Sequence, residues 1–441
     1  MNCSMRSRRR SLFPENPSVI RPVRRSAAID RIASEFLVPS SRPTPRILVA
    51  PDSLKESLAA AAAAEAIERG VRIACPEASV RLVPLADGGE GTLEAMSRAR
   101  PEIELRDVAV VGPRPDRPPR RARWGLSADR RRAIVELAEA AGLAGMPAAD
   151  RDPCETGTHG VGELLEHARG ALDTTGSESV EILLALGGSA TVDGGIGLAR
   201  AIGIEILGPS GPVDRPLVGA DLESIEGVRI EPELRAKWAD VRLRILNDVG
   251  NPAWGPDGAA RIYGPQKGAG PMAVERLDRG IRHWCHVLES TFGLELDGPG
   301  FGAAGGVVLG LVPLLAGAGE DGDAVVRRHL HSGFELVSDL VRLEEKIVAA
   351  DLVVTSEGRL DGQSFMGKGV GRLLELAESH GVPIVAVPGS VEGLDERLGR
   401  RFAEIVSLEE TVGVTDARRR PAEALALSAA EAVGRWCARP G

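Results

Sequence analysis

Residues 184–201 read LALGGSATVDGGIGLARA, and this stretch decides the fold. It begins as an apolar run of strand length and ends with the apolar spacing of a helix, as at the strand-to-helix junctions of α/β proteins. The stretch carries five glycines, two hydroxyl side chains and one aspartate. Glycines at such a junction let backbone N–H groups approach an anion, whereas a purely structural turn is the alternative.

The same alternation recurs near both ends of the chain. RILVAPDSLKES, starting at residue 46, predicts a strand and a turn before an Ala-rich helix, and ADLVVTSEGRLDG and VPIVAVPGS repeat the pattern later. The middle of the chain mixes alternating strands with Pro- and Arg-containing loops. We therefore predict an α/β protein of two domains with a cleft between them. The outer, doubly wound (Rossmann- or flavodoxin-like) domain comprises residues 46–98 and 300–441, and the inserted mixed α/β domain comprises residues 99–299.

Composition excludes several classes of function. The net charge of −9 and the aromatic content of 3% argue against nucleic-acid binding. The five cysteines share no metal-like spacing, which indicates free thiols and a cytoplasmic location, and no stretch reads as a membrane span. Residues 1–45 are rich in Arg without periodicity, so we predict a disordered basic arm.

Five polar, glycine-rich stretches follow apolar strands, where open parallel sheets bind ligands. They contain close carboxylates that suit Mg²⁺, glycines that suit anions, and isolated cations that can meet a phosphate. These are the components of phosphoryl transfer, which depends on positioning and electrostatics. Each has a structural alternative: an acidic turn can merely cap a helix, and a lysine at a helix start can be merely solvated.

Other chemistries lack their motifs. The chain has no P-loop motif, no strand-linked G-x-G-x-x-G and no G-x-S-x-G, which disfavours dehydrogenase and triad hydrolase chemistry. Two close groups of metal-type side chains read as surface residues rather than as zinc ligands, because neither has further ligands nearby. They are His283, Cys285 and His286, and His329 and His331.

Taken together, the polar stretches resemble the bacterial type I glycerate kinases. The matching segments, in order from about residue 46 to 407, are APDSLKESL, PLADGGEGT, GGSATVDGG, DVGNPAWGPDGAARIYGPQKGA, and EGRLDGQ with HGVPIVAVPGS. The resemblance implies two α/β domains and ATP- and Mg²⁺-dependent phosphorylation of glycerate, with 2-phosphoglycerate favoured over 3-phosphoglycerate. A kinase for another small hydroxy acid and a non-catalytic sensor of small acids are the alternatives. The sequence departs from the family pattern at Glu56, where a Gly is common, at Val192, where an Asn is common, and at Gly250, where an Asp is common.

Within this resemblance, chemistry assigns roles. Arg359 or Lys267 would bind the glycerate carboxylate, and Asp193, ahead of Asp361, would take the hydroxyl proton. The residues expected to bind ATP or substrate, with Lys55 as a phosphate-contacting lysine, are Asp52, Ser53, Lys55, Gly187, Gly188, Ser189, Thr191, Gln266 and Lys267. The expected metal ligands are Asp87, Glu90, Asp248 and Glu357. The expected partners are small molecules, without nucleic acid or membrane, and a homo-oligomer is left open.

Overall fold

The computed structural model describes residues 44–54, 57–176, 179–296, 298–316, 321, 324, 328–365 and 369–439. Almost all of the predicted basic arm, residues 1–45, lies outside these residues, as do Lys55 and Glu56.

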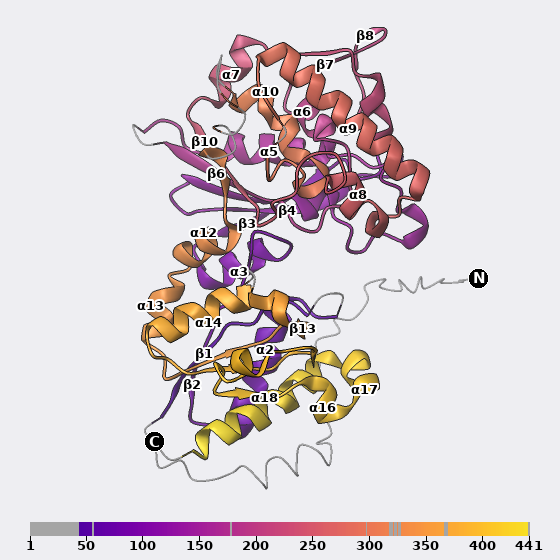
Figure 1. The fold of residues 1–441 in the computed structure, drawn as a ribbon. Helices are drawn as coiled ribbons and strands as arrows, with labels where there is room; N and C mark the ends of the chain where they lie inside the picture. The colour runs from indigo at the N-terminus through magenta and orange to yellow at the C-terminus, as the bar shows by residue number, and fades with distance from the viewer. Residues whose placement is uncertain are drawn as a thin grey trace, which may run out of the picture.

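Both ends of the chain build one parallel sheet, which we call the outer sheet (Figure 1). Its strand order is β16-β14-β12-β1-β2. The bounds are β1 (Arg46–Val49), β2 (Ser79–Leu82), β12 (Leu352–Thr355), β14 (Ile384–Ala386) and β16 (Glu404–Ile405). The central strands are continuous apolar runs because helices cover both faces. Ile47 faces one side with Val49, and Leu48 faces the other.

The middle of the chain builds a second sheet, which we call the inserted sheet, in the order β11-β10-β6-β5-β4-β3. The first four strands in that order are parallel, and β4 and β3 are antiparallel to their neighbours. The bounds are β3 (Glu104–Val110), β4 (Arg120–Leu126), β5 (Arg132–Glu136), β6 (Val180–Ala185), β10 (Val241–Leu246) and β11 (Leu330–His331).

Helices form three layers around the two sheets. The outermost layer on the outer sheet is α2 (Ala60–Ala74) with α18 (Pro421–Cys437). The middle layer lies between the sheets and comprises α3 (Thr92–Ala99), α12 (Gly333–Leu340), α13 (Leu343–Val348) and α14 (Gly369–Ser379) (Figure 1). The last layer covers the far face of the inserted sheet with α5 (His159–Ala171), α6 (Ile196–Ala201) and α9 (Pro271–Phe292). Leu48 of the outer sheet and Leu183 of the inserted sheet therefore share one apolar core.

The remaining elements are short. The helices are α4 (Leu137–Ala141), α7 (Pro232–Trp238), α8 (Ala259–Tyr263), α10 (Val312–Leu315), α15 (Glu396–Gly399), α16 (Leu408–Val412) and α17 (Val414–Arg419). The strands are β7 (Glu205–Gly208), β8 (Gly211–Pro212), β9 (Gly227–Arg229), β13 (Arg359–Leu360) and β15 (Ser390–Val391). No helix among the described residues is both long enough and apolar enough to cross a membrane.

The two ends of the chain are joined by close packing of α2 on α18. A Cβ atom added to Gly70 would lie 2.3 Å from the carbonyl oxygen of Ala426 and 2.8 Å from the Cβ of Ala429. Only glycine therefore lets the two helix backbones approach so closely.

The α/β class predicted from the sequence is confirmed. For the domain division we propose one change. Phe301 and Val312 pack in the core of the inserted sheet, and β11 pairs with β10 of that sheet. We therefore propose that the inserted domain ends near residue 331 instead of 299.

Candidate active site

Two glycine-rich turns meet where strands of the two sheets end. One turn follows β2 and carries Asp87 to Glu90, and the other follows β6 and begins at Gly187. A Cβ on Gly187 would lie 2.2 Å from the Cα of Gly89, so the two backbones touch. The carboxyl ends of both sheets therefore contribute to a single site, as expected for open parallel sheets.

The second turn offers backbone donors. Within the described part of the chain, the N–H groups of Gly188 and Ser189 donate no hydrogen bond. The groups on either side of them do bond: the carbonyl of Gly188 accepts from the N–H of Leu143, and the N–H of Ala190 donates to the carbonyl of Ala141. Gly188 has a φ of +74°, a left-handed backbone conformation in which a residue with a side chain would be strained. Unused N–H groups on a glycine turn suit a phosphate or carboxylate oxygen.

Lys267 lies directly behind this turn. Its Nζ atom donates to the carbonyl oxygen of Thr191 at 2.8 Å and lies 3.3 Å from the Oγ of Ser189, which in turn lies 3.0 Å from the Oγ1 of Thr191. The side chain is buried, and burial lowers the pKa of Lys267 to about 7, although nearby Asp193 acts in the opposite direction. The lysine is thus held where its charge state is sensitive to its surroundings.

Asp193 is fully buried and accepts four hydrogen bonds. Its Oδ2 accepts from the N–H of Thr158 (2.8 Å), the hydroxyl of Thr158 (2.7 Å) and the N–H of Gly197 (3.3 Å), and its Oδ1 accepts from the N–H of Gly195 (3.2 Å). Burial raises the pKa of Asp193 against the effect of these bonds. This geometry argues against the role of general base that the sequence suggested, because the carboxylate is out of reach of solvent and already engaged.

The first turn carries two carboxylates, and a third lies nearby. Asp87 and Glu90 are exposed, and a Cβ on Gly188 would lie 3.0 Å from the Oε2 of Glu90. Asp248 follows β10 and accepts from the N–H groups of Gly333 (3.1 Å) and Phe334 at the start of α12. Its pKa is raised, chiefly by desolvation and also by the nearby charge of Asp87. A cation between these groups would relieve that repulsion.

These carboxylates fit Mg²⁺ only if the substrate supplies further ligands. No group of three or more metal-type side chains is close enough, among the described residues, to hold a metal ion alone. Mg²⁺ commonly uses one or two carboxylates together with phosphate oxygens and water. The donor set therefore fits a metal that arrives with a nucleotide.

The outer sheet contributes a separate polar group. Asp52 follows β1, and its N–H donates to the carbonyl of Ser356 beside Glu357, while the N–H of Ser53 donates to the carboxylate of Asp52. Arg359 is exposed and pairs with Asp361 (3.0 Å) and with Glu392 (3.1 Å). The guanidinium is therefore already bound to two carboxylates, which leaves it less suited to hold a substrate anion.

The structure also shows the surroundings of several other residues that the sequence analysis singled out. Gln266 is exposed on the short 3₁₀ turn that buries Lys267, and a Cβ on Gly250 would meet no atom within 4 Å. Lys55 lies outside the described residues, so its predicted phosphate contact stays a prediction. Of the cysteine and histidine groups, Cys285 is buried, and rings of His283 and His329 bond to backbone carbonyls.

Two residues of the site were not predicted from the sequence. Thr158 holds Asp193, and Glu136 at the end of β5 is buried against the first turn. Glu136 did carry a signal, because an acid stands at the end of the apolar run AIV and before the apolar Leu137 in AIVELAEA. Thr158 lies in TGTHG before a helix and carried none beyond an ordinary capping pattern.

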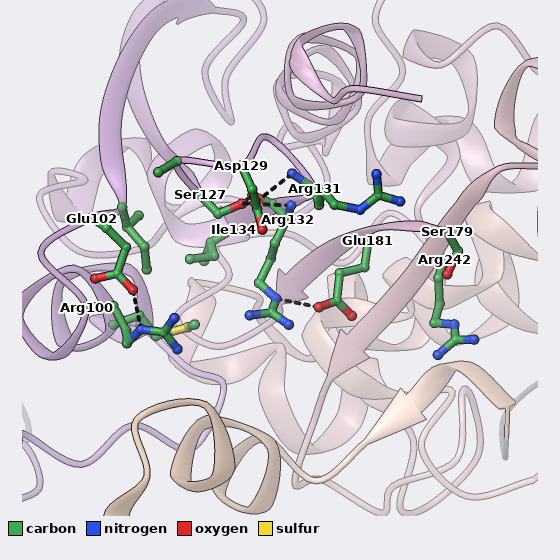
Figure 2. A pocket seen from close by; sticks show the side chains of 13 residues that line it. Arg100, Glu102, Ser127, Asp129, Arg131, Arg132, Ile134, Ser179, Glu181 and Arg242 are labelled. Atoms are coloured by element: carbon green, nitrogen blue, oxygen red, sulfur yellow. Dashed lines mark hydrogen bonds and ion pairs between the residues drawn. The ribbon is translucent and has the colours of Figure 1, made fainter. Parts of the chain in front are cut away.

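A hollow of about 430 Å³ lies elsewhere, at the amino ends of the inserted strands (Figure 2). Arg132 at the start of β5 pairs there with Glu181, and Arg100 pairs with Glu102 at 2.5 Å. None of the predicted site residues lines it. Because ligands of parallel sheets bind at the carboxyl ends of strands and these charges are paired, we place the site at the two turns instead.

The contact between the two turns allows a direct test. The Gly187→Ala change is expected to lower activity by at least about tenfold and to lower the melting temperature by a few degrees, because the new methyl group meets backbone that cannot rotate away. Gly170→Ala is the matched control, since a Cβ there meets nothing within 4 Å. Steady-state kinetics and thermal melts on both proteins measure the effect, and equal behaviour of the two would contradict the contact.

Comparison with known proteins adds to this geometry. Residues 47–438 match the model of the glycerate kinase family. A glycerate kinase from Halalkalibacterium halodurans is 39% identical over 350 residues, which cover 78% of this chain and 85% of that protein. A glycerate 2-kinase from Escherichia coli is 38% identical with the same coverage. A crystal structure from Salmonella typhimurium, described as that of glycerate kinase 2, superposes with a TM-score of 0.68 at 34% identity and covers 89% of this chain and 98% of that one.

Proposed function

Because this chain belongs to the glycerate kinase family and is a kinase, we propose that it transfers the γ-phosphoryl group of ATP to the 2-hydroxyl of glycerate. The observation that carries the proposal is the junction of the two turns. It brings unused N–H groups, a buried lysine and exposed carboxylates together where the two sheets end. The name of the similar Escherichia coli protein, glycerate 2-kinase, supports the choice of hydroxyl.

We assign the binding roles by charge. The N–H groups of Gly188 and Ser189 would hold an oxygen of the transferring phosphoryl group. Lys267, which lies behind this turn, would supply positive charge. Ser189 and Thr191 would set the position of the lysine. Asp52 and Ser53 follow the carboxyl end of β1 in the outer sheet and would contact the other substrate.

We propose a new role for Asp193. The carboxylate would keep Lys267 charged and would hold the turn through Thr158 and Gly197, instead of removing the hydroxyl proton. Phosphoryl transfer proceeds through a loose transition state in which positioning and charge matter more than a strong base. Asp361, the second candidate for the base, is paired with Arg359.

Mg²⁺ would be held by one or two of the carboxylates of Asp87, Glu90 and Asp248, together with phosphate oxygens and water, and Glu357 stays outside this set. When bound, Mg²⁺ neutralises developing charge on the phosphates. These carboxylates would place the metal beside residues 187–189.

The function is tested by coupling ADP formation to a detectable reaction with glycerate as the acceptor. Phosphorus NMR of the product then separates 2-phosphoglycerate from 3-phosphoglycerate. We expect turnover with glycerate and a single product, 2-phosphoglycerate. If only another small hydroxy acid is turned over, that acid replaces glycerate as the proposed substrate. If glycerate binds without ADP formation, the result favours a sensor.

Asp87→Asn is expected to lower kcat by about 10²-fold, because a neutral amide is a weaker Mg²⁺ ligand than a carboxylate. The fold should persist, since the carbonyl oxygen of an Asn can still accept from the N–H of Gly89 (3.0 Å). Asp173→Asn is a matched control, because Asp173 accepts from the N–H of Thr175 in the same way, at 3.0 Å. Near wild-type kcat for Asp87→Asn at saturating Mg²⁺ would remove Asp87 from the metal site.

We also propose that the reaction takes place in the cytoplasm. The proposal rests on the thiols, because Cys75, Cys154 and Cys285 form no disulfide within the described part of the chain, and Cys75 and Cys285 are buried. Free buried thiols suit a reducing compartment.

A further inference from the structure

Helix α3 begins without a cap from its own segment. Its N-cap residue is Gly91, which has no side chain, and the first turn of a helix leaves backbone N–H groups without intrahelical partners. The missing acceptor comes from β5, 45 residues later. The Oε1 of Glu136 accepts from the N–H of Gly91 at 2.7 Å, and its Oε2 accepts from the N–H of Leu93 at 3.1 Å.

The position of Glu136 links this cap to both turns of the site. Gly91 directly follows the turn that carries Asp87 and Glu90. On the other side, Glu136 immediately precedes α4, and a Cβ on Gly188 would lie 3.2 Å from the Cβ of Ala138 in that helix. One side chain of the inserted sheet therefore fixes the end of the first turn beside the start of the second.

The cost of burying Glu136 indicates that these bonds matter. Only 3% of the residue is exposed, and burial raises the pKa of its carboxyl to about 7, against the effect of the two N–H bonds. The charged groups that face it are Glu90 from the turn, Glu139 from α4 and Arg123 from β4. Arg123 is bound to Glu139 (2.8 Å), so the N–H groups of α3 are the partners that Glu136 has for its charge. A cap made only for stability would not require a buried acid from another sheet, since Ser or Thr at the N-cap serves that purpose.

We propose that Glu136 is a positioning residue that holds the turn bearing Asp87 and Glu90 at the phosphoryl-transfer site. The proposal rests on the proposed function for its catalytic consequence but not for its structural one. If the cap fixes the turn, its loss frees the backbone of residues 86–93 and displaces both carboxylates from residues 187–189.

The structural part is tested by amide hydrogen exchange on the full chain without substrate or metal. In Glu136→Gln, we expect peptides covering residues 86–93 to exchange at least about tenfold faster, because an amide nitrogen would face one of the two N–H donors. The matched control is Asp395→Asn at the cap of α15, where the side chain accepts from the N–H of Arg397 at 2.7 Å. That control should accelerate exchange only around its own helix. Unchanged exchange of residues 86–93 in Glu136→Gln would overturn the proposal.

The catalytic part is tested by kinetics with ATP, glycerate and varied Mg²⁺. We expect Glu136→Gln to raise the Mg²⁺ concentration for half-maximal rate by about tenfold and to lower kcat, with less effect on the KM for glycerate. Glu136→Asp retains the charge but is shorter, so we expect partial recovery of both the exchange and the metal response; it also serves if the Gln variant does not fold. Faster exchange with unaltered kcat and metal response would limit Glu136 to stability and overturn its positioning role. An inactive wild-type protein would instead refute the proposed function and leave the exchange result standing.

Discussion

The Asp193→Asn protein is expected to lose about 10³-fold in kcat/KM at about pH 8, with part of the loss recovered at about pH 6. Asp193 favours the charged form of Lys267, whose pKa burial lowers to about 7. Removing that negative charge lowers the pKa of the lysine further, so less of it is charged at neutral pH. Acidic conditions restore the charge, and the variant should therefore work best at lower pH than the wild type.

The same substitution is expected to lower the melting temperature. An Asn side chain can accept at only one of its two terminal atoms, whereas both oxygens of Asp193 accept. One buried N–H group then loses its acceptor, at a cost of about 1–3 kcal/mol in the free energy of unfolding.

Thr158→Val separates the two effects. It removes the hydroxyl that donates to Asp193 at 2.7 Å and keeps the carboxylate charge. We expect a lower melting temperature without the shift in the pH profile. A stable Asp193→Asn protein with the wild-type pH profile would contradict the role that we assign to Asp193.

Lys267→Met is expected to lower kcat by about 10³-fold, because methionine matches the length of lysine but offers no positive charge to a phosphoryl group. Its stability should differ from that of the wild type in a pH-dependent way. In the folded wild type the lysine loses its proton near its pKa of about 7, whereas in the unfolded chain it keeps the proton up to the ordinary value of 10.5. Between these values the unfolded state binds more protons, so wild-type stability gains up to about 1.4 kcal/mol per pH unit from this group.

Urea unfolding at several pH values between about 7 and 9 measures that difference. Lys267→Met should lack the gain, so its stability relative to the wild type should fall as the pH rises. Lys237→Met is the control, because Lys237 is partly exposed and pairs with Glu166 at 2.6 Å. Parallel pH dependences of the wild type and Lys267→Met would show that the lysine is charged in the folded protein throughout this range.

How far the sequence predicts the site depends on whether a contact is local. The strand before residue 187 and the helix after residue 195 follow from periodicity, and the structure places them at β6 and α6. The contact between Gly89 and Gly187 cannot be predicted from either segment, because the local sequence of a turn does not indicate which turn of the other sheet it contacts. Glu136 and Thr158 were missed for the same reason, since their partners lie 45 and 35 residues away.

Burial is the second property that the sequence did not give. Asp193 and Lys267 read as active polar residues in glycine-rich turns, and the expectation that both face the ligand ignored how much chain covers them. The structure buries both, and this burial supports our proposal that Asp193 acts as a charge partner of Lys267 instead of as the base. Arg359 shows the converse, because this residue, expected from the sequence to bind the glycerate carboxylate, is paired with two carboxylates of the protein itself.

The packing of Gly70 against Ala426 bears on how the polypeptide is made. β1 pairs with β12, and α2 packs on α18, so the outer layers cannot be completed until residues 421–437 have left the ribosome. Except for β11, the strands of the inserted sheet all lie between residues 104 and 246, with β7, β8 and β9 of a separate small sheet between β6 and β10. Most of the inserted sheet is therefore synthesised about a hundred residues before β12. The order of synthesis therefore favours folding of the inserted sheet first. During this time the apolar face of α2 stays exposed, because α18 has not yet been synthesised. This interval is when binding of a chaperone to residues 60–74 would protect the nascent chain from aggregation.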